Sequence, residues 1–153
     1  MTTKLRTSRV TSGELRYRTI YQPASSNTRP VSQKLREAIF NTLGHDLSGL
    51  KVLDLYAGSA ALAIEALSRG AVSATTIESD RLAQRAITAN ERDLGVSLGL
   101  RSETVEDFLS SDKNSYDIVF FYSPYAIFDV SRAAEASARL AKGGVLVISC
   151  SSK

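Results

Sequence analysis

The sequence predicts an α/β fold in which parallel strands alternate with helices. Three observations predict it. Short apolar runs alternate with segments of helical periodicity from Lys51 onward. Small or charged residues follow each apolar run. The length of 153 residues is that of one domain. A content of 43% hydrophobic and 23% charged residues is typical of a folded chain. Because β–α–β crossovers are right-handed, we expect helices on both faces of the sheet.

A hairpin and a helix are predicted in the first part of the chain, before Lys51. Two β-prone segments, at 9–11 and 15–21, flank a turn signal at 12–13 and predict a small hairpin. A helix is expected from residues 30–32 to a stop at Gly44. Its apolar stripe consists of Leu35, Ile39 and Leu43.

The alternating elements follow. We expect strands at 52–56, 74–77, 98–104, 117–122 and 145–149. We expect helices at 61–68, 81–93, 105–110 and 131–141, the last followed by a turn at 143–144.

Composition excludes several classes of protein. With Cys150 as the single cysteine, an internal disulfide is impossible, and a reducing compartment is expected. The chain contains no apolar run of about 18 residues, so we expect no membrane span. The N-terminus shows no secretory signal, so a cytoplasmic protein is predicted. His45 is the only histidine, which excludes a histidine-based metal site, and no metal is expected.

The charge is concentrated in residues 1–36. This segment holds eight basic residues and one acidic residue, Glu14, for a net charge of +7, whereas residues 37–153 carry a net charge of −4. Such an asymmetry indicates a surface for a polyanion, most simply a nucleic acid. A solvated basic tail without a partner is the alternative, and charge alone does not decide between the two.

The residue clusters of interest follow the predicted strands. They lie at 54–59, 78–80, 103–105 and 122–125, and the carboxyl ends of parallel strands meet at one rim, where α/β sheets bind ligands. The first cluster has one glycine, Gly58, and is not a dinucleotide-binding fingerprint. A tight turn without a ligand is its alternative interpretation. Glu78 could accept hydrogen bonds from ribose hydroxyls, while Asp80 could cap the next helix.

Three motifs carry a resemblance to a known family. They are Leu-Asp-Leu-Tyr-Ala-Gly-Ser at 53–59, Glu-Ala-Leu-Ser-Arg-Gly-Ala at 65–71 and Ile-Glu-Ser-Asp at 77–80. They resemble S-adenosylmethionine-dependent methyltransferases, and more narrowly the bacterial family that methylates N2 of a guanine in 16S ribosomal RNA. The basic hairpin, Thr-Arg-Pro at 28–30 and the helix after it are similar to the family's N-terminal segment. The resemblance covers residues 8–149. It implies a Rossmann-like class I methyltransferase sheet (residues 31–153) preceded by a basic hairpin and linker (1–30).

The resemblance also implies a cofactor, a substrate and site residues. The cofactor would be S-adenosyl-L-methionine, with Asp54 and the turn at 57–59 at its methionine part, Glu78 at the ribose and Ser79 beside the adenine. The substrate would be 16S ribosomal RNA or the small ribosomal subunit. The implied cofactor-binding residues are Asp54, Tyr56, Ala57, Gly58, Ser59, Glu78, Ser79, Thr104 and Val105. The implied catalytic residues are Tyr122, Ser123, Pro124 and Tyr125. The implied RNA-binding residues are Arg6, Arg9, Arg16, Arg18 and Arg29.

The chain departs from the family pattern in three loops. The family's catalytic loop reads Asp-Pro-Pro followed by Tyr or Phe, but here Tyr122 and Ser123 replace its first two residues. Ala60 stands in place of a glycine, and we expect its methyl group to narrow the passage for methionine. Thr104 replaces an aspartate, and the neighbouring Glu103 is expected to face the other side.

The C-terminal region differs as well. The family adds a two-stranded hairpin after the fifth strand, and this sequence stops at Lys153, so the sheet is expected to be truncated there. The strand from Val145 to Ser149 would then be an edge that either self-associates or lowers stability. Two main hypotheses follow: an active ribosomal RNA methyltransferase, or a degenerate relative that binds RNA or ribosomal precursors without efficient transfer. A ligand sensor without RNA binding ranks last because it leaves the basic segment unexplained.

Overall fold

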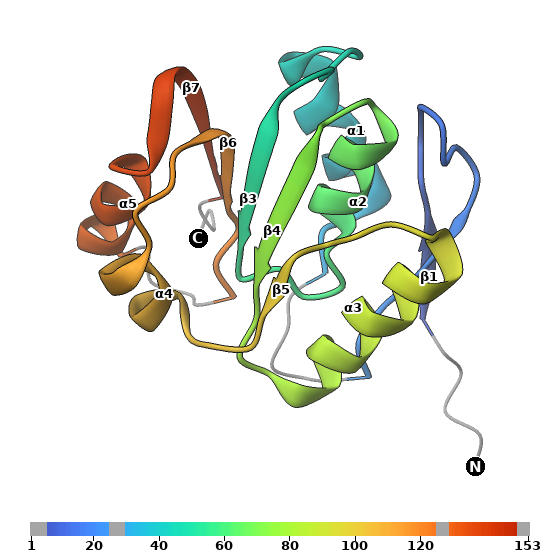
Figure 1. The fold of residues 1–153 in the computed structure, drawn as a ribbon. Coiled ribbons are helices and arrows are strands. Elements are labelled where there is room, and N and C mark those ends of the chain that lie inside the picture. Colours follow the sequence, from blue (N-terminus) through green and yellow to red (C-terminus); the bar gives the residue numbers. More distant parts are fainter. Residues whose placement is uncertain (1–5, 25–29, 125–128, 150–153) are drawn as a thin grey trace.

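The computed structural model describes residues 6–24, 30–124 and 129–149, and its centre is a five-stranded, all-parallel sheet (Figure 1). The strand order is β5-β4-β3-β6-β7. The strands are β3 (Lys51–Leu55), β4 (Ser73–Ile77), β5 (Leu100–Arg101), β6 (Tyr116–Phe121) and β7 (Leu140–Ile148). The predicted parallel α/β sheet is therefore confirmed.

Five helices cover the two faces of the sheet. They are α1 (Gln33–Leu43), α2 (Ala61–Ser68), α3 (Arg81–Leu94), α4 (Val105–Ser111) and α5 (Val130–Ser137). In Figure 1, α4 and α5 lie on one face and α1, α2 and α3 on the other. Alternate residues of β3 point to opposite faces, so Leu53 and Leu55 pack with Phe108 of α4, while Val52 packs with Phe40 of α1.

A hairpin of β1 (Thr7–Arg9) and β2 (Thr19–Tyr21) precedes the sheet and packs beside α2 and α3 (Figure 1). Val10 and Ile20 are almost fully buried in a cluster with residues of α2 and α3. The expected antiparallel hairpin is present, but its strands lie elsewhere than at 9–11 and 15–21: β1 ends at Arg9 and β2 begins at Thr19. The residues between the strands form a turn, part of which bonds α2. The backbone N–H of Glu14 donates to the Ser68 carbonyl at 2.8 Å.

The expected apolar stripe of α1 is only partly correct. Ile39 and Leu43 pack against the core, but Leu35 is 39% exposed, and the fully buried residues of the helix are Arg36 and Phe40. Arg36 is buried because it finds a carboxylate partner in α2, which periodicity cannot reveal.

The last helix and strand also begin and end elsewhere than expected. Helix α5 ends at Ser137 rather than at residue 141, and β7 begins at Leu140. The expected turn at 143–144 lies inside β7, where the register with β6 shifts between Tyr116 and Ile118. A Cβ on Gly144 would meet the Asp117 carbonyl at 3.0 Å, so glycine permits this close approach. Among the described residues, the helices are all too short or too polar to cross a membrane.

Candidate functional site

The order in which strands are added to the sheet reverses next to β3. β4 and β5 lie on one side of β3, and β6 and β7 lie on its other side. Such a switch point is where α/β sheets bind ligands, at the carboxyl ends of the strands. Two cavities lie there. The first is lined by Asp54, Ala57, Gly58, Ser59, Leu62 and Tyr122, with Gln22, Pro23, Pro30 and Val31 as its outer wall. The second, of about 260 Å³, is lined by Ile77, Glu78, Ser79, Thr104 and Val105, together with the charged residues Glu103, Glu106, Asp129 and, from α5, Arg132. Tyr56 lines both.

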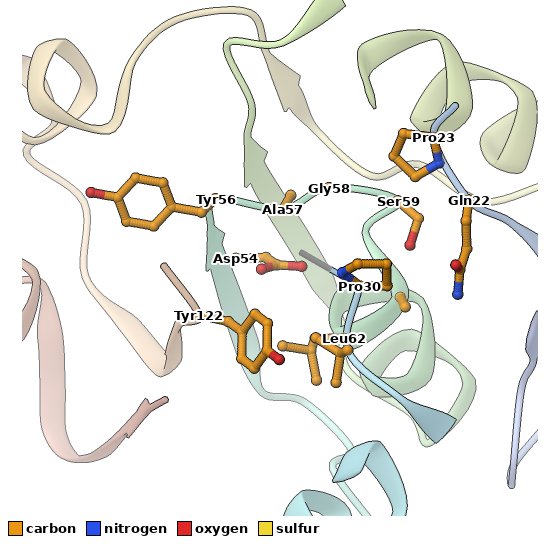
Figure 2. A pocket seen from close by; sticks show the side chains of 12 residues that line it. Gln22, Pro23, Pro30, Asp54, Tyr56, Ala57, Gly58, Ser59, Leu62 and Tyr122 are labelled. Atoms are coloured by element: carbon orange, nitrogen blue, oxygen red, sulfur yellow. The ribbon is translucent and has the colours of Figure 1, made fainter. Parts of the chain in front are cut away.

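Asp54 points into the first cavity from the end of β3 (Figure 2). Its side chain is 1% exposed, and Oδ2 has no hydrogen-bond partner. Burial raises the pKa of Asp54 well above its usual value; a hydrogen bond from the Ala63 backbone lowers this pKa, and the nearby Glu78 raises it. An unpartnered buried carboxylate oxygen is costly, so this group suits a cationic donor such as an ammonium.

Glu78 ties the loop after β3 to the end of β4. Its Oε1 accepts a hydrogen bond from the Gly58 backbone at 2.8 Å, and its Oε2 accepts one from the Asp80 backbone at 2.8 Å. Burial raises its pKa as well, although these two backbone donors oppose the rise. Each carboxylate oxygen keeps a second lone pair, so Glu78 can still accept ligand hydroxyls. Asp80 caps α3, as the sequence indicated, by accepting from the Ala83 backbone at 2.9 Å.

Tyr56 separates the two cavities. It adopts a left-handed backbone conformation with φ 57°, and its ring points away from Asp54 (Figure 2). The ring packs edge-on against Phe121, with 5.4 Å between the ring centres. Its position beside Ile77 and Val105 gives the second cavity an apolar wall that suits a flat ring.

The turn at Ala57, Gly58 and Ser59 is held from outside by α3. Asn90 is fully buried, and its Nδ2 donates to the Ser59 carbonyl at 3.1 Å. The same side chain bonds the backbone of Tyr21 twice, accepting from its N–H at 2.8 Å and donating to its carbonyl at 3.0 Å. Sequence reasoning missed Asn90; a polar residue on the buried side of a helix was the available signal.

Two expectations about the loops after β3 and β5 are wrong. Ala60 does not line the cavity: its methyl group is buried in the core with Val10 and Ile20, and it adopts φ 64°, a conformation that favours glycine. Glu103 does not face away from Thr104, because both line the second cavity. Thr104 also caps α4 by accepting from the Asp107 backbone at 3.1 Å.

The loop after β6 brings Tyr122 to the first cavity. Its ring lies beside Leu62 and Pro30 (Figure 2) and is 9% exposed. Ser123 is 8% exposed and Pro124 is half-buried. Tyr125 lies outside the described residues, so its predicted stacking role stays a prediction.

Four of the predicted RNA-binding arginines are exposed on or near the hairpin: Arg6, Arg9, Arg16 and Arg18. Arg18 also donates to the Asp93 carbonyl at 2.7 Å. Arg29 lies outside the described residues. Arg36 is one of the eight basic residues of the segment 1–36, but it is fully buried and does not contribute to the positive charge of the surface.

Arg36 belongs to a buried cluster with Glu65 and Arg69. The two Nε atoms lie 3.1 Å from opposite oxygens of Glu65. Glu65 also accepts from the backbone of Thr11 at 2.9 Å and of Ser12 at 3.2 Å, and Arg36 donates to the Arg9 carbonyl. Burial lowers the pKa of Arg36, and Glu65 opposes this. The cluster fixes the hairpin to α1 and α2, so the motif at 65–71 holds the N-terminal segment rather than a ligand.

Within the described part of the chain, His, Cys, Asp and Glu side chains form no group that could hold a metal ion.

Comparisons with known proteins show the family and the fold of the chain. The model of the family described as conserved hypothetical protein 95 matches residues 8–153. Ribosomal RNA small subunit methyltransferase D of Escherichia coli K12 is 34% identical over 118 residues, which are 76% of this chain and 60% of the relative. The chain thus spans about 60% of the length of this curated relative.

Solved structures extend the likeness to the fold. The Escherichia coli protein yhhF aligns with a TM-score of 0.81 and 28% identity over 92% of this chain and 79% of its own. A precorrin-6y C5,15-methyltransferase of Geobacter metallireducens, 20% identical, aligns with a TM-score of 0.68 over 81% of this chain and 65% of its own. This second likeness concerns the fold alone, which is that of class I methyltransferases. The chain belongs to the family described as conserved hypothetical protein 95, and it is similar in sequence to ribosomal RNA small subunit methyltransferase D.

Proposed function

We propose that this chain binds S-adenosyl-L-methionine at the carboxyl ends of β3 and β4 and methylates N2 of a guanine in small-subunit ribosomal RNA. One observation carries the proposal: the buried Oδ2 of Asp54 has no partner and borders a cavity. The names of the relatives support ribosomal RNA as the substrate. Ribosome assembly would place the protein in the cytoplasm.

The residues that line the two cavities suit the two halves of the cofactor. The first cavity holds about 20 Å³, so its walls must move apart for the methionine part to enter. Asp54 would accept a hydrogen bond from the methionine ammonium, and the turn at 57–59 would border the methionine chain. Glu78 would accept from the ribose hydroxyls. Ser79, Thr104 and Val105 would border the adenine, with Tyr56 and Ile77 as an apolar wall.

The loop after β6 would position the guanine. The N2 lone pair is delocalised into the ring, so acceptors must orient the amine toward the methyl group. Tyr122 and the backbone carbonyl of Ser123 would accept from the two N2 hydrogens, and Tyr125 would stack on a base turned out of its helix. S-adenosylmethionine would supply the methyl group: its bond to sulfur would break as the bond to N2 forms, and N2 would release one proton to water.

A second function is favoured by one observation. Tyr122 is a neutral acceptor at the position where the resemblance implies an aspartate, and hydrogen bonds to charged groups contribute about 1.5–3 kcal/mol. The alternative is therefore a protein that binds RNA or ribosomal precursors and transfers methyl groups poorly. The exposed hairpin arginines support RNA binding in both cases.

Two experiments test these proposals. Calorimetric titration with S-adenosylhomocysteine should show binding that Asp54→Ala abolishes and Asp46→Ala, at an exposed site, leaves unchanged. Absence of binding to the folded protein would overturn the enzyme proposal. Single-turnover methylation of unmethylated small subunits then separates the two functions. A large rate gain in the double variant Tyr122→Asp with Ser123→Pro would show that the wild-type loop is a weakened catalyst, and full activity of the wild type would exclude the alternative.

Self-association through β7 belongs to the same proposal. β7 is the last strand of the described sheet, and Val145 and Ile148 are 45% and 39% exposed. Unpaired edges with apolar side chains recruit further strands. Sedimentation velocity should show a concentration-dependent dimer that Val145→Lys removes, and a wild type that stays monomeric at high concentration would contradict this.

A further inference from the structure

A groove of about 470 Å³ lies between the segment after β2 and the exposed side of α3. Its size is within the range of about 300–1,000 Å³ that small-molecule sites occupy. Apolar groups form much of its surface, from Pro23, Leu82, Ala86 and Ala89, with Leu82 42% exposed. Tyr21 contributes a ring at one end.

The charge around this groove is mainly positive. Arg85 and Arg92 line it, and both are exposed. The acidic residue among its lining residues is Asp93, whose carboxylate lies 3.5 Å from the Nε of Arg92. Arg18 of the N-terminal segment donates to the Asp93 carbonyl, so the groove is continuous with the exposed arginines near the hairpin.

The groove adjoins the first cavity. Gln22 and Pro23 line both, so a single chain segment lies between them. Asn90 of α3 fixes this segment by bonding the backbone of Tyr21. A ligand in the groove would therefore lie next to the cavity that contains Asp54 and Tyr122.

We propose that this groove holds an unpaired nucleotide of the substrate RNA, adjacent to the guanine that the loop after β6 would position. An unpaired base packs on apolar or planar side chains, which Leu82, Ala86 and Ala89 supply, while arginines pair with the flanking phosphates. The positive charge favours RNA over an apolar peptide. The inference rests on the proposed function and extends the RNA surface from the hairpin to α3, whose arginines sequence reasoning did not include.

The test uses a short fluorescein-labelled single-stranded oligoribonucleotide and the full chain. Arg85→Gln and Arg92→Gln should each weaken binding several-fold and reduce the slope of log K against log salt by about 1. Leu82→Ser should weaken binding without changing this slope. The control is Lys113→Gln, which removes one exposed charge between α4 and the start of β6. It should change neither the affinity for the oligoribonucleotide nor the salt slope.

Several outcomes would overturn the proposal. One is an equal loss of affinity in Arg85→Gln and Lys113→Gln, which would show a general charge effect. Another is unchanged binding in Leu82→Ser, which would place the base elsewhere. A third is a polyglutamate peptide that binds with the same dependence on Arg85, Arg92 and Leu82, which would assign the groove to an acidic protein. Titration with S-adenosylhomocysteine does not depend on these RNA-binding measurements. It therefore distinguishes a failure of the proposed enzyme function from a failure of the groove to bind RNA.

Discussion

The side-chain amide of Asn90 donates to the Ser59 carbonyl at 3.1 Å, and this bond links α3 to the loop that borders Asp54. The same side-chain amide also bonds both backbone groups of Tyr21: it accepts from the N–H and donates to the carbonyl, as the backbone of a neighbouring strand would. One buried side chain thus joins the N-terminal hairpin to the candidate cofactor loop. The position of each depends on the other through this residue.

Asn90→Ala should therefore reduce both stability and cofactor affinity. It removes three hydrogen bonds of a buried group, which at about 1 kcal/mol each predicts a loss of about 3 kcal/mol in the free energy of unfolding. The matched control is Thr88→Ala on the same helix, where an exposed hydroxyl donates to the Gln84 carbonyl. Urea unfolding and titration with S-adenosylhomocysteine measure the two effects. An unchanged ligand affinity in folded Asn90→Ala would contradict the link to Ser59.

Glu65→Gln should destabilise the protein strongly. Glu65 is fully buried and contacts two guanidinium groups, so the variant leaves both charges without a carboxylate. Removing one partner of a buried ion pair costs about 3–5 kcal/mol. Glu37→Gln is the control because Glu37 is exposed on α1, next to Arg36. Equilibrium unfolding in urea checks the difference, and a loss in Glu65→Gln no larger than in Glu37→Gln would contradict the structural role of the cluster.

The sequence predicted local elements well where local signals decide them. Helix α2 begins and ends at the predicted residues, because a buried strand and an Arg-Gly pair bracket it. Residues at 54, 78 and 122 could be placed at one rim, because parallel strands order their carboxyl ends. These predictions needed no knowledge of distant contacts.

Contacts between distant segments could not be predicted in the same way. Glu65, Ser68 and Arg69 belong to a motif that carries the family resemblance, yet only the packed structure shows that they bind the segment at 11–15. The same applies to Arg36, whose charge appeared to belong to a surface. The bulge in β7 depends on its register with β6, which the Gly143-Gly144 pair indicated only as a turn.

Gly13→Ala should release the hairpin from α2. A Cβ at Gly13 would lie 1.9 Å from the Ser68 carbonyl oxygen, and the residue adopts φ +87°. Gly49→Ala is the control, since Gly49 has a similar φ of +80° but open space around its Cβ position. Backbone strain alone costs about 1–2 kcal/mol, and overpacking adds about 1–3 kcal/mol.

The difference between these two variants isolates the contact with Ser68. Gly13→Ala should be less stable in urea than Gly49→Ala, and trypsin should cleave it faster after Arg16 and Arg18. Equal stability and equal cleavage rates would show that the turn at Gly13 does not hold the hairpin.

The raised pKa of Asp54 predicts how stability changes with pH. Burial lifts this pKa in the folded protein, so over the pH range between the unfolded and folded pKa values the folded state holds a proton that the unfolded state has released. The stability that this group contributes is complete below the unfolded pKa and is lost as the pH rises through the folded pKa. At neutral pH, Asp54 should therefore reduce the stability of the ligand-free protein, and the nearby Glu78 increases that cost.

Asp54→Asn should raise the free energy of unfolding at pH 7 by on the order of 1 kcal/mol, and this gain should vanish toward pH 4. Asp46→Asn is a control of opposite sign, because hydrogen bonds from Ser48 lower the pKa of Asp46 and its carboxylate stabilises the fold as the pH rises. Urea unfolding across this pH range compares the two variants. If Asp54→Asn loses S-adenosylhomocysteine binding while gaining stability, the buried carboxylate is kept for its ligand and not for the fold. A variant less stable than wild type at every pH would show instead that the charged form of Asp54 is satisfied within the protein.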